Sequence, residues 1–501
     1  MSSETTTPTA AGNADSKSND ENPRKRPPPK DGDDLKASSE REDEAEKGGG
    51  APNDGEKPGK RGNKWVKRGG SNKRSFAKKG AGKWMKDFGD GGRNSRDDPP
   101  HVGSFANPAM REMFGVVLDD TDKTNDDDDG ADKKDKVPTN KRKVALFLGF
   151  LGTRYGGFQV NPEQRTLQAE IELALYRCGM ISKSNFGTPH KYSWSNSART
   201  DKGVHACAQV CSVKVELPET DWETKLPANN RLEDPRKCLQ AHLPEDITVL
   251  DIVRTTRNFC AKTQRDRVRY QYMVPSFLLH PDWRGVMEET GIDTTRGPAN
   301  RKNIDVKQPL TTEEAEKLYA VLRGYRSTEE NRNLLAAALK KYEGTQFFHN
   351  FTKGLKPGQA QARRFIETFV CQDPVVVDGV EWIPTQVLGQ SFLLHQIRKM
   401  ICVAIDVARG TAPLGFLDRA LNKKESIALH VAPAQGLFLE MSYFGGYNRR
   451  KGTQTNHDLP DIDWTVDGPA KTRWSDFRDR VRSHICQEDK RQLNFVQFLF
   501  L

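Results

Sequence analysis

The chain has 501 residues, a formal net charge of +10 and a pI near 9.0. That length leaves room for two or three domains, and the basic balance favours an anionic partner, for which nucleic acid is the usual case. The sequence has no run of about 18 apolar residues, which argues against a membrane partner.

The 8 cysteines are scattered and stand mostly among apolar residues, as expected of reduced core thiols in a cytosolic or nuclear protein. Cys207 and Cys211 share one face of a predicted strand. No Cys-x-x-Cys pair or nearby pair of histidines completes a zinc site around them. We therefore expect neither a disulfide framework nor a metal site.

Residues 1–139 are predicted to form a disordered, charged arm, because aliphatic residues are too few there to build a core. The basic cluster at 24–30 reads either as a nuclear import signal, which we favour, or as a solvated charge run. Residues 64–86 interleave cations with aromatic rings. This mixture suits phosphate contacts and base stacking, and it suits a flexible solubilising arm equally well.

The segment 140–262 is predicted to be an N-terminal α/β half. In chain order its elements are a strand, a glycine-rich turn, a helix, a second strand, and a helix end with a third strand: 143–150, 152–157, 166–178, 204–215 and 239–253. The tetrad 199–202 lies in the loop ahead of the second strand. Its side chains can be offered to a ligand from a rigid scaffold.

The segment 263–447 is predicted to be a second α/β half. Strands are expected at 267–274, 364–376 and 380–390, and helices at 392–408 and, as two patterns separated near Ser327, within 311–340. The charged stretch 281–309 is predicted to be an inserted loop. In the tail, 448–501, a helix at 474–487 places one apolar stripe against the body: Trp474, Phe477, Val481 and Ile485. The elements together predict an α+β body with an antiparallel sheet.

Two residues can be assigned chemistry from their neighbours alone. Asp201 is flanked by Arg199 and Lys202, and cations that close keep a carboxylate ionised at neutral pH. Arg398 borders the apolar stripe of the helix predicted at 392–408, where it needs an acceptor. A carboxylate from another segment would serve. The alternative is an arginine that snorkels to the surface.

The segment 198–206 reads A-R-T-D-K-G-V-H-A and resembles the signature of the TruA family of tRNA pseudouridine synthases. Further matching segments follow that family's order, so that the resemblance covers roughly 143–445: 155–159, 267–272, 389–400 and 432–437. Residues 344–352 and the form H-Q-I-R-K-M resemble the eukaryotic tRNA pseudouridine synthase 1 branch of the family.

The resemblance implies two α/β halves whose mostly antiparallel sheets adjoin, with a central basic cleft that receives a uridine removed from its stack. It implies that Asp201 is the essential carboxylate, which attacks the nucleotide at the sugar or the base or removes a sugar proton. Arg398 would pair with it, Tyr270 would stack on the target base, and Arg199 would help to hold the flipped nucleotide. No cofactor is implied. The remaining positions expected to bind substrate are Tyr155, Phe158, Gln159, Lys202, His205, His395 and Lys399.

The chain departs from the bacterial pattern at Lys202, where those enzymes commonly carry Ala, and at Phe158, where many carry Trp. Neither change removes a catalytic group. His205 starts a strand and His395 is expected on the exposed face of its helix, so structural or RNA-contacting roles are favoured over proton transfer. The insert near 281–340 and the tail after 447 look like eukaryotic additions.

Three functions stay open on this sequence. The first is an isomerase that converts uridine to pseudouridine in tRNA. The second is a non-catalytic RNA-binding or tRNA-folding factor on the same fold. The third, a glycosidase, requires a second carboxylate poised near Asp201, which the motif lacks. The resemblance favours the isomerase, acting in the nucleus on tRNA, with small nuclear RNA and mRNA as further candidate substrates. A monomer is favoured.

Overall fold

The computed structural model of the protein describes residues 105, 107–116, 139–218, 233–293, 310–451 and 459–499. The predictions for the basic cluster at 24–30 and for the stretch 64–86 fall outside the described residues, as does most of the predicted disordered arm. None of the described helices has both the length and the apolar composition needed to cross a lipid bilayer.

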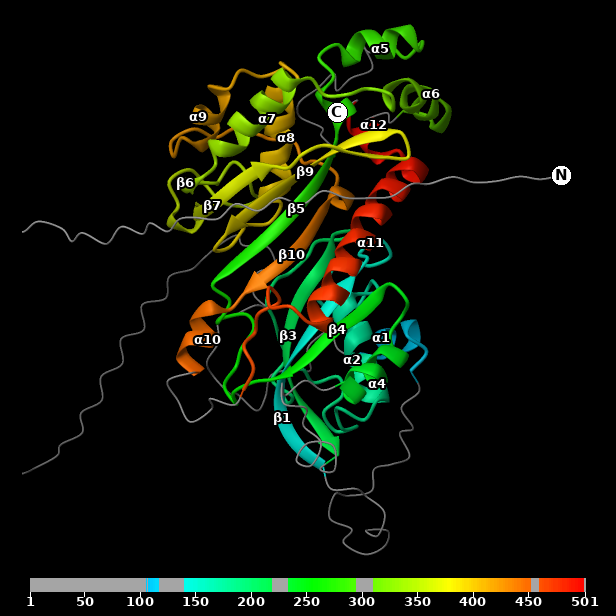
Figure 1. Ribbon diagram of the computed structural model, residues 1–501, viewed down its shortest axis with the longest axis vertical. Coiled ribbons are helices and arrows are strands. Elements are labelled where there is room, and N and C mark those ends of the chain that lie inside the picture. Colours follow the sequence, from blue (N-terminus) through cyan, green and yellow to red (C-terminus); the bar gives the residue numbers. More distant parts are fainter. Residues whose placement is uncertain are drawn as a thin grey trace, which may run out of the picture. The chain divides into compact units, whose positions relative to one another are not determined.

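A single sheet of ten described strands runs through the body (Figure 1). The strands are β1 (Thr139–Phe150), β2 (Ser195–Asn196), β3 (His205–Pro218), β4 (Ile247–Arg254), β5 (Arg267–Pro275), β6 (Gly344–Phe347), β7 (Arg363–Cys371), β8 (Val375–Val377), β9 (Val380–Gly389) and β10 (Leu437–Tyr443). The main path follows the order β4-β1-β3-β10-β5-β9-β7-β6, with β2 beside β3 and β8 beside β9. Every described strand pair is antiparallel except β10 with β3, so the predicted mostly antiparallel α+β sheet is confirmed.

The first half is built on β1, which pairs with β3 on one side and with β4 on the other. Leu146 and Leu148 of β1 are fully buried, as the alternating pattern predicted. Helices α2 (Leu167–Arg177) and α4 (Glu233–Ala241) contact each other, and α4 also contacts β4. Helix α2 ends ahead of Gly179, whose φ of +70° is the left-handed conformation that commonly closes a helix.

The second half adds helices to the strands β5 to β9. Besides a short helix in the inserted stretch, described below, its helices are α6 (Thr312–Leu322), α7 (Glu329–Lys340), α8 (Gln396–Ala408), α9 (Phe416–Leu421) and α10 (Gly445–Lys451), with short 3-10 turns at Ser276–Leu279, Ala360–Ala362 and Ala434–Gly436. Thr311 and Thr328 each form a capping box at the start of α6 and α7. The two predicted helices within 311–340 are therefore confirmed, with Ser327 between them.

The two halves meet at β3 and β10. Strand β10 comes from the end of the second half and pairs in parallel with β3, with Phe438 opposite His205. On its other side β10 pairs with β5, where Leu439 lies opposite Tyr270. The predicted adjoining sheets thus form one continuous sheet. The loop that carries Asp201 enters this sheet at the strand that borders the second half.

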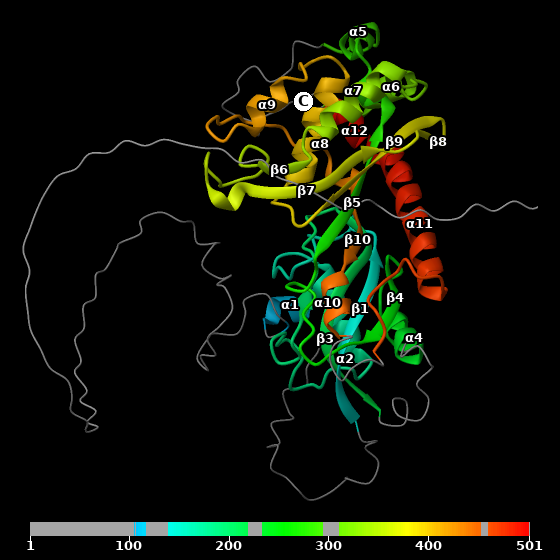
Figure 2. The same cartoon turned by 60° about the vertical axis from the view of Figure 1, so that its left-hand side comes forward.

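The predicted docking helix of the tail is α11 (Pro469–Gln492), which is followed by α12 (Asn494–Leu499). Its apolar stripe is buried as expected: Trp474, Phe477, Val481 and Ile485. A Cβ at Gly149 of β1 would lie 2.5 Å from the Phe477 ring, so only glycine lets the helix approach this closely. Figures 1 and 2 show α11, in red, running along the sheet from the first half towards the second.

Two predictions of irregular structure are wrong in part. Within the arm predicted to be disordered up to 139, residues Pro108–Met113 form helix α1, which is capped by the Asn107 side chain. Phe105 stacks on Phe186 at 4.6 Å between ring centroids, and Met110 is fully buried. These few apolar side chains order a polar segment because they fill a site on the folded body, which average composition does not reveal.

Within the predicted loop 281–309, residues Trp283–Glu289 form helix α5. The Asp282 side chain accepts a hydrogen bond from the Gly285 N–H (3.0 Å), and Met287 is buried. A cap and a few apolar side chains that pack on the core, Met287 with Trp283 and Val286, set this short helix in an otherwise charged stretch.

Candidate active site

Asp201 stands in a short loop whose backbone is fixed at both ends. The Phe158 N–H donates to the Thr200 carbonyl (3.1 Å), and the Val204 N–H donates to the Asp201 carbonyl (3.1 Å). Gly157 has a φ of +106°, and a Cβ at this position would lie 3.0 Å from the Thr200 oxygen. The glycine-rich turn therefore packs directly against the backbone that carries Asp201.

Buried polar side chains hold the segment just ahead of Asp201. The Ala198 carbonyl accepts hydrogen bonds from Asn196 Nδ2 and from Gln209 Nε2, each at 2.6 Å. Gln209 belongs to β3 and is fully buried. The loop is thus anchored to its own strand, and the carboxylate is presented from a rigid support.

The Asp201 carboxylate faces two basic side chains from the start of α8. Asp201 Oδ2 lies 3.7 Å from His395 Nε2 and 4.0 Å from Arg398 Nη1. Arg398 Nε donates to the Ala432 carbonyl (2.7 Å), which anchors the guanidinium while Nη1 stays directed at the carboxylate. The Asp201 side chain keeps 30% of its surface exposed, against 15% for Arg398. The carboxylate can therefore meet a substrate while it is held between both halves of the sheet.

The prediction that His395 lies on the exposed face of its helix is wrong. Helix α8 begins at Gln396 rather than at 392, and His395 precedes it in the left-handed conformation with φ 60°. That turn swings the imidazole towards Asp201. Burial lowers the pKa of His395, and the nearby Asp201 charge opposes the shift only partly.

Tyr270 lies on β5 close to this group. Its ring meets Phe392 edge to face, with 5.6 Å between the centroids. Burial raises the pKa of Tyr270 to about 12, although the charge of Arg265 lowers it, so its hydroxyl stays protonated at neutral pH. The ring lies close enough to Asp201 for the carboxylate charge to act on the pKa of Tyr270, and the ring is buried.

Arg265 was not predicted from the sequence to be a site residue, although its side chain contacts the backbone on both sides of the site. Its Nη1 donates to the Ser197 carbonyl (2.6 Å), four residues before Asp201, and its Nη2 donates to the Gln390 carbonyl (3.2 Å), five residues before His395. One guanidinium therefore ties together the two segments that carry the facing groups. The available signal was a cluster of arginines at 265–269, which is no more specific than an RNA-contacting surface.

Four residues expected to bind substrate are instead part of the interior. Tyr155 donates its hydroxyl to Asp246 Oδ1 (2.7 Å), and Phe158 is fully buried. His205 is fully buried as well, with Nδ1 accepting from the Gly152 N–H (3.0 Å). Lys399 donates its ammonium to the carbonyls of Asn350 (3.0 Å) and Thr352 (3.3 Å). Motif membership predicted contact with RNA, and in the structure these four side chains are buried in the body around the site.

The other expected contact residues face outward to differing degrees. Arg199 and Lys202 are exposed on either side of Asp201, and Gln159 is half-buried. Exposed cations beside a carboxylate are placed to meet a phosphate backbone. Their contact with RNA stays a prediction.

Among the described residues, one group of side chains could hold a metal ion, although no metal site was predicted from the sequence. Cys178, Cys238 and His242 offer ligand atoms that all lie within 4.8 Å of one another. Two sulfurs and one imidazole nitrogen suit Zn²⁺, with a fourth position left for water. Cys238 and His242 are four apart on α4 and just beyond it, and Cys178 ends α2, so only packing brings the third ligand to the pair. None of the residues facing Asp201 belongs to this group.

The fold and the site define a class of protein: an α+β enzyme in which an aspartate from one half of a continuous sheet faces an arginine and an imidazole from the other. Comparison with known proteins identifies the family. Residues 338–444 match the family model described as tRNA pseudouridine synthase.

The chain is also similar to several curated proteins. It is 33% identical over 370 residues to tRNA pseudouridine synthase 1 of Yarrowia lipolytica, covering 64% of this chain and 67% of that protein. It is 31% identical over 339 residues to the pseudouridylate synthase 1 homolog of Mus musculus, covering 67% and 68%. It is 31% identical over 382 residues to tRNA pseudouridine(27/28) synthase of Saccharomyces cerevisiae, covering 71% and 97%. The chain belongs to the tRNA pseudouridine synthase family.

Proposed function

We propose that the protein converts uridine to pseudouridine at internal sites in tRNA, with Asp201 as the essential carboxylate. The observation that carries the proposal is the meeting of Asp201 with His395 and Arg398 across the junction of the two halves. Arg398 is anchored at Ala432 and points its free nitrogen at the carboxylate. This arrangement places a fixed positive charge beside the carboxylate that would act as nucleophile or base.

The reaction needs no redox partner, since it only rearranges the bonds of one nucleotide. The N1–C1′ bond breaks, a C5–C1′ bond forms, C5 loses its hydrogen as a proton, and N1 gains a proton. Asp201 would act by attacking the sugar or the base, or by removing a sugar proton. Each path requires the carboxylate to reach the nucleotide, and the exposed part of Asp201 allows this.

Binding of RNA follows from charge and from an aromatic ring. A net charge of +10 favours a polyanion, and Arg199 and Lys202 lie exposed beside Asp201. Taking a base out of its stack costs a few kcal/mol, which stacking on Tyr270 would partly offset. Tyr270 is buried here, so substrate would have to displace its cover, and the nearest covering ring is Phe392.

The substrate range is the finer part of the proposal. A relative is named for positions 27/28 of tRNA, which supports the anticodon stem as a target region for this chain. Small nuclear RNA and mRNA are further candidates. The basic cluster at 24–30 supports a nuclear location, and we favour a monomer.

The test is release of tritium from tRNA transcripts that carry 5-tritiated uridine. The wild-type protein is expected to release tritium and to form pseudouridine, while Asp201→Ala and Asp201→Asn proteins should release none above background yet still bind the transcript. Lys423→Ala, a change outside the site, serves as the control. Wild-type turnover that persists in both Asp201 variants would refute the role of the carboxylate. A wild-type protein that binds tRNA without releasing tritium would point to the non-catalytic factor.

A further inference from the structure

The turn that supports Asp201 is itself supported by the C-terminal helix. Besides the contacts of Gly157 and Phe158, the turn meets the end of the Asp201 loop at Gly152. A Cβ at Gly152 would lie 2.1 Å from the Val204 carbonyl oxygen. A shift of the turn must therefore displace the Asp201 loop, because no space separates the two backbones.

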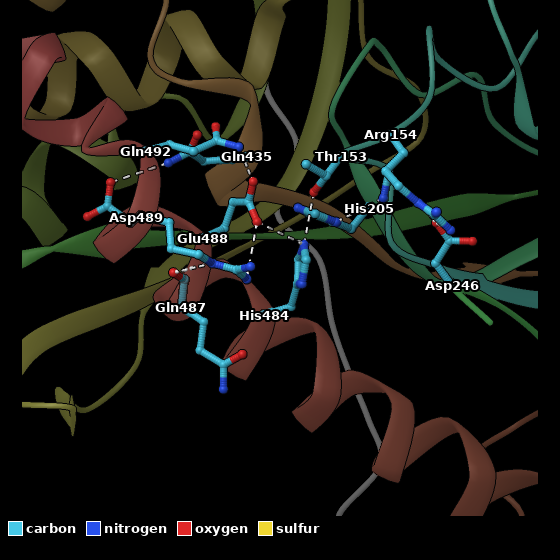
Figure 3. A network of polar contacts seen from close by, with 12 residues as sticks. Thr153, Arg154, His205, Asp246, Gln435, His484, Gln487, Glu488, Asp489 and Gln492 are labelled. Atoms are coloured by element: carbon cyan, nitrogen blue, oxygen red, sulfur yellow. Dashed lines mark hydrogen bonds and ion pairs between the residues drawn. The ribbon is translucent and has the colours of Figure 1, made fainter. Parts of the chain in front are cut away.

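Two histidines, His205 and His484, contact the start of this turn, and Figure 3 shows both beside Thr153. His205 Nδ1 accepts from the Gly152 N–H at 3.0 Å, and Thr153 Oγ1 shares a hydrogen bond with His484 Nε2 at 2.9 Å. The two imidazoles lie edge to face, with 5.3 Å between their centroids. His205 belongs to β3, but His484 belongs to α11 and is separated from Thr153 by 331 positions.

The rest of the turn is tied to the first half. Arg154 Nη2 pairs with Asp246 Oδ2 at 2.8 Å, and the Tyr155 hydroxyl bonds the other oxygen of the same carboxylate. Asp246 immediately precedes β4. Thr153 is thus the point at which a segment otherwise held within the first half contacts α11.

The far end of α11 is locked into the second half. Asp489 accepts from the Phe495 N–H (3.1 Å) and from Gln435 Nε2 (3.3 Å), and Gln435 lies just ahead of β10. Glu488, which is buried, lies 3.8 Å from His484 Nε2 and contacts Gln492 one turn later. The helix therefore runs from the turn behind Asp201 to the segment next to Pro433 and Ala432, where Arg398 is anchored.

We propose that His484 and Thr153 are positioning residues, through which α11 sets the placement of the Asp201 loop against Arg398 and His395. This inference rests on the proposed function. Neither residue touches the facing groups, so both would act on the chemical step through the turn at 152–157. The eukaryote-like tail would then be part of the catalytic framework rather than a peripheral addition.

The experiment measures kcat and KM by tritium release, together with tRNA affinity and thermal unfolding, for four single variants of the full chain and for the double variant His484→Ala with Thr153→Ala. His484→Ala and Thr153→Ala remove the contact from either side, and His484→Gln keeps a polar atom near the position of Nε2. Gln487→Ala is the matched control, because Gln487 is exposed on the same helix and its side chain donates to Ser483, while its carbonyl, which accepts from Arg491, is kept in the variant.

We expect kcat to fall by about three- to tenfold in each alanine variant, the size of a lost hydrogen bond, with KM and tRNA affinity unchanged within twofold. The double alanine variant should be no slower than the slower single variant, since one contact is removed in both cases. His484→Gln should recover most of kcat, and Gln487→Ala should match the wild type.

The inference is overturned if the wild-type protein is active and the alanine variants keep its kcat, or if they lose only thermal stability. It is also overturned if His484→Gln fails to recover kcat while unfolding at the wild-type temperature. An inactive wild-type protein would instead count against the proposed function, so the two failures are distinguishable.

Discussion

Replacement of Arg265 by alanine should separate the two segments that carry the facing groups of the site. Its guanidinium donates to the Ser197 carbonyl at 2.6 Å and to the Gln390 carbonyl at 3.2 Å. Burial lowers the pKa of Arg265, which reflects how far this charge is removed from water. The variant leaves both carbonyls without this donor.

The two bonds should contribute unequally. Ser197 is buried, and a buried acceptor left without a donor costs about 1–3 kcal/mol. The bond to Gln390 is exposed, so water can replace it at little cost. We therefore expect the free energy of unfolding to fall by about 2 kcal/mol. The effect on kcat should be larger, at least about tenfold, because a displacement of a facing group by about 1 Å is enough to slow a positioned reaction strongly.

Arg267 provides a matched control two residues further along. Its Nη1 lies 2.9 Å from Glu367 Oε1, but this pair is exposed and should contribute at most about 1 kcal/mol. Urea unfolding and tritium release would be measured for Arg265→Ala, Arg265→Lys and Arg267→Ala. Lysine should recover only part of the loss, since one ammonium cannot reproduce the planar fork that reaches both carbonyls. Arg265 does not tie the two segments together if its alanine variant and that of Arg267 are indistinguishable in both measurements.

Two further predictions concern backbone space and pH. Gly157→Ala should reduce kcat without loss of the fold, because a Cβ there would lie 3.0 Å from the Thr200 oxygen at a φ of +106°. Gly410→Ala is the control: its φ is +79° and the space around it is open, so it should lower stability only. Equal activity of the two variants would contradict this prediction. Burial lowers the pKa of His205 to about 3, whereas the pKa in the unfolded chain is near 6.5. Between these two pH values the unfolded chain binds a proton that the folded protein does not, so the free energy of unfolding should fall as the pH decreases through this window. His205→Asn should remove this contribution. The free energy of unfolding, measured with urea between pH 7 and pH 5, should then fall less steeply than in the wild type, by about 1.4 kcal/mol per pH unit below 6.5. Parallel curves for the two proteins would contradict the lowered pKa of His205.

Much of the architecture could be predicted because local patterns decided it. Residues 143–150 and 204–215 alternate and form β1 and β3, and the two capping boxes at Thr311 and Thr328 begin α6 and α7. The apolar stripe from Trp474 to Ile485 is buried as one face of α11. Periodicity and caps are properties of neighbouring residues, so a single sequence carries them.

Predictions failed where a side chain's surroundings come from distant segments. Tyr155, Phe158, His205 and Lys399 belong to motifs around the site, and a motif does not say which of its members point inward. His395 was assigned to a helix face, but the left-handed turn at that residue directs it to Asp201. Arg265 carried no distinct signal, since its two acceptors are 68 and 125 positions away in the chain.

The sequence by itself determined the longer helices and strands with regular apolar patterns, the mostly antiparallel α+β class, the basic balance that favours RNA, and Asp201 as the carboxylate to examine. The tertiary structure alone decided that β10 returns to pair with β3, that His395 joins Arg398 beside Asp201, and that α11 contacts the turn that supports the Asp201 loop. The reason is physical: hydrogen-bonded periodicity and capping act over a few residues. The contacts of the site join residues that are far apart in the chain, and only the packing of the complete sheet brings them within reach.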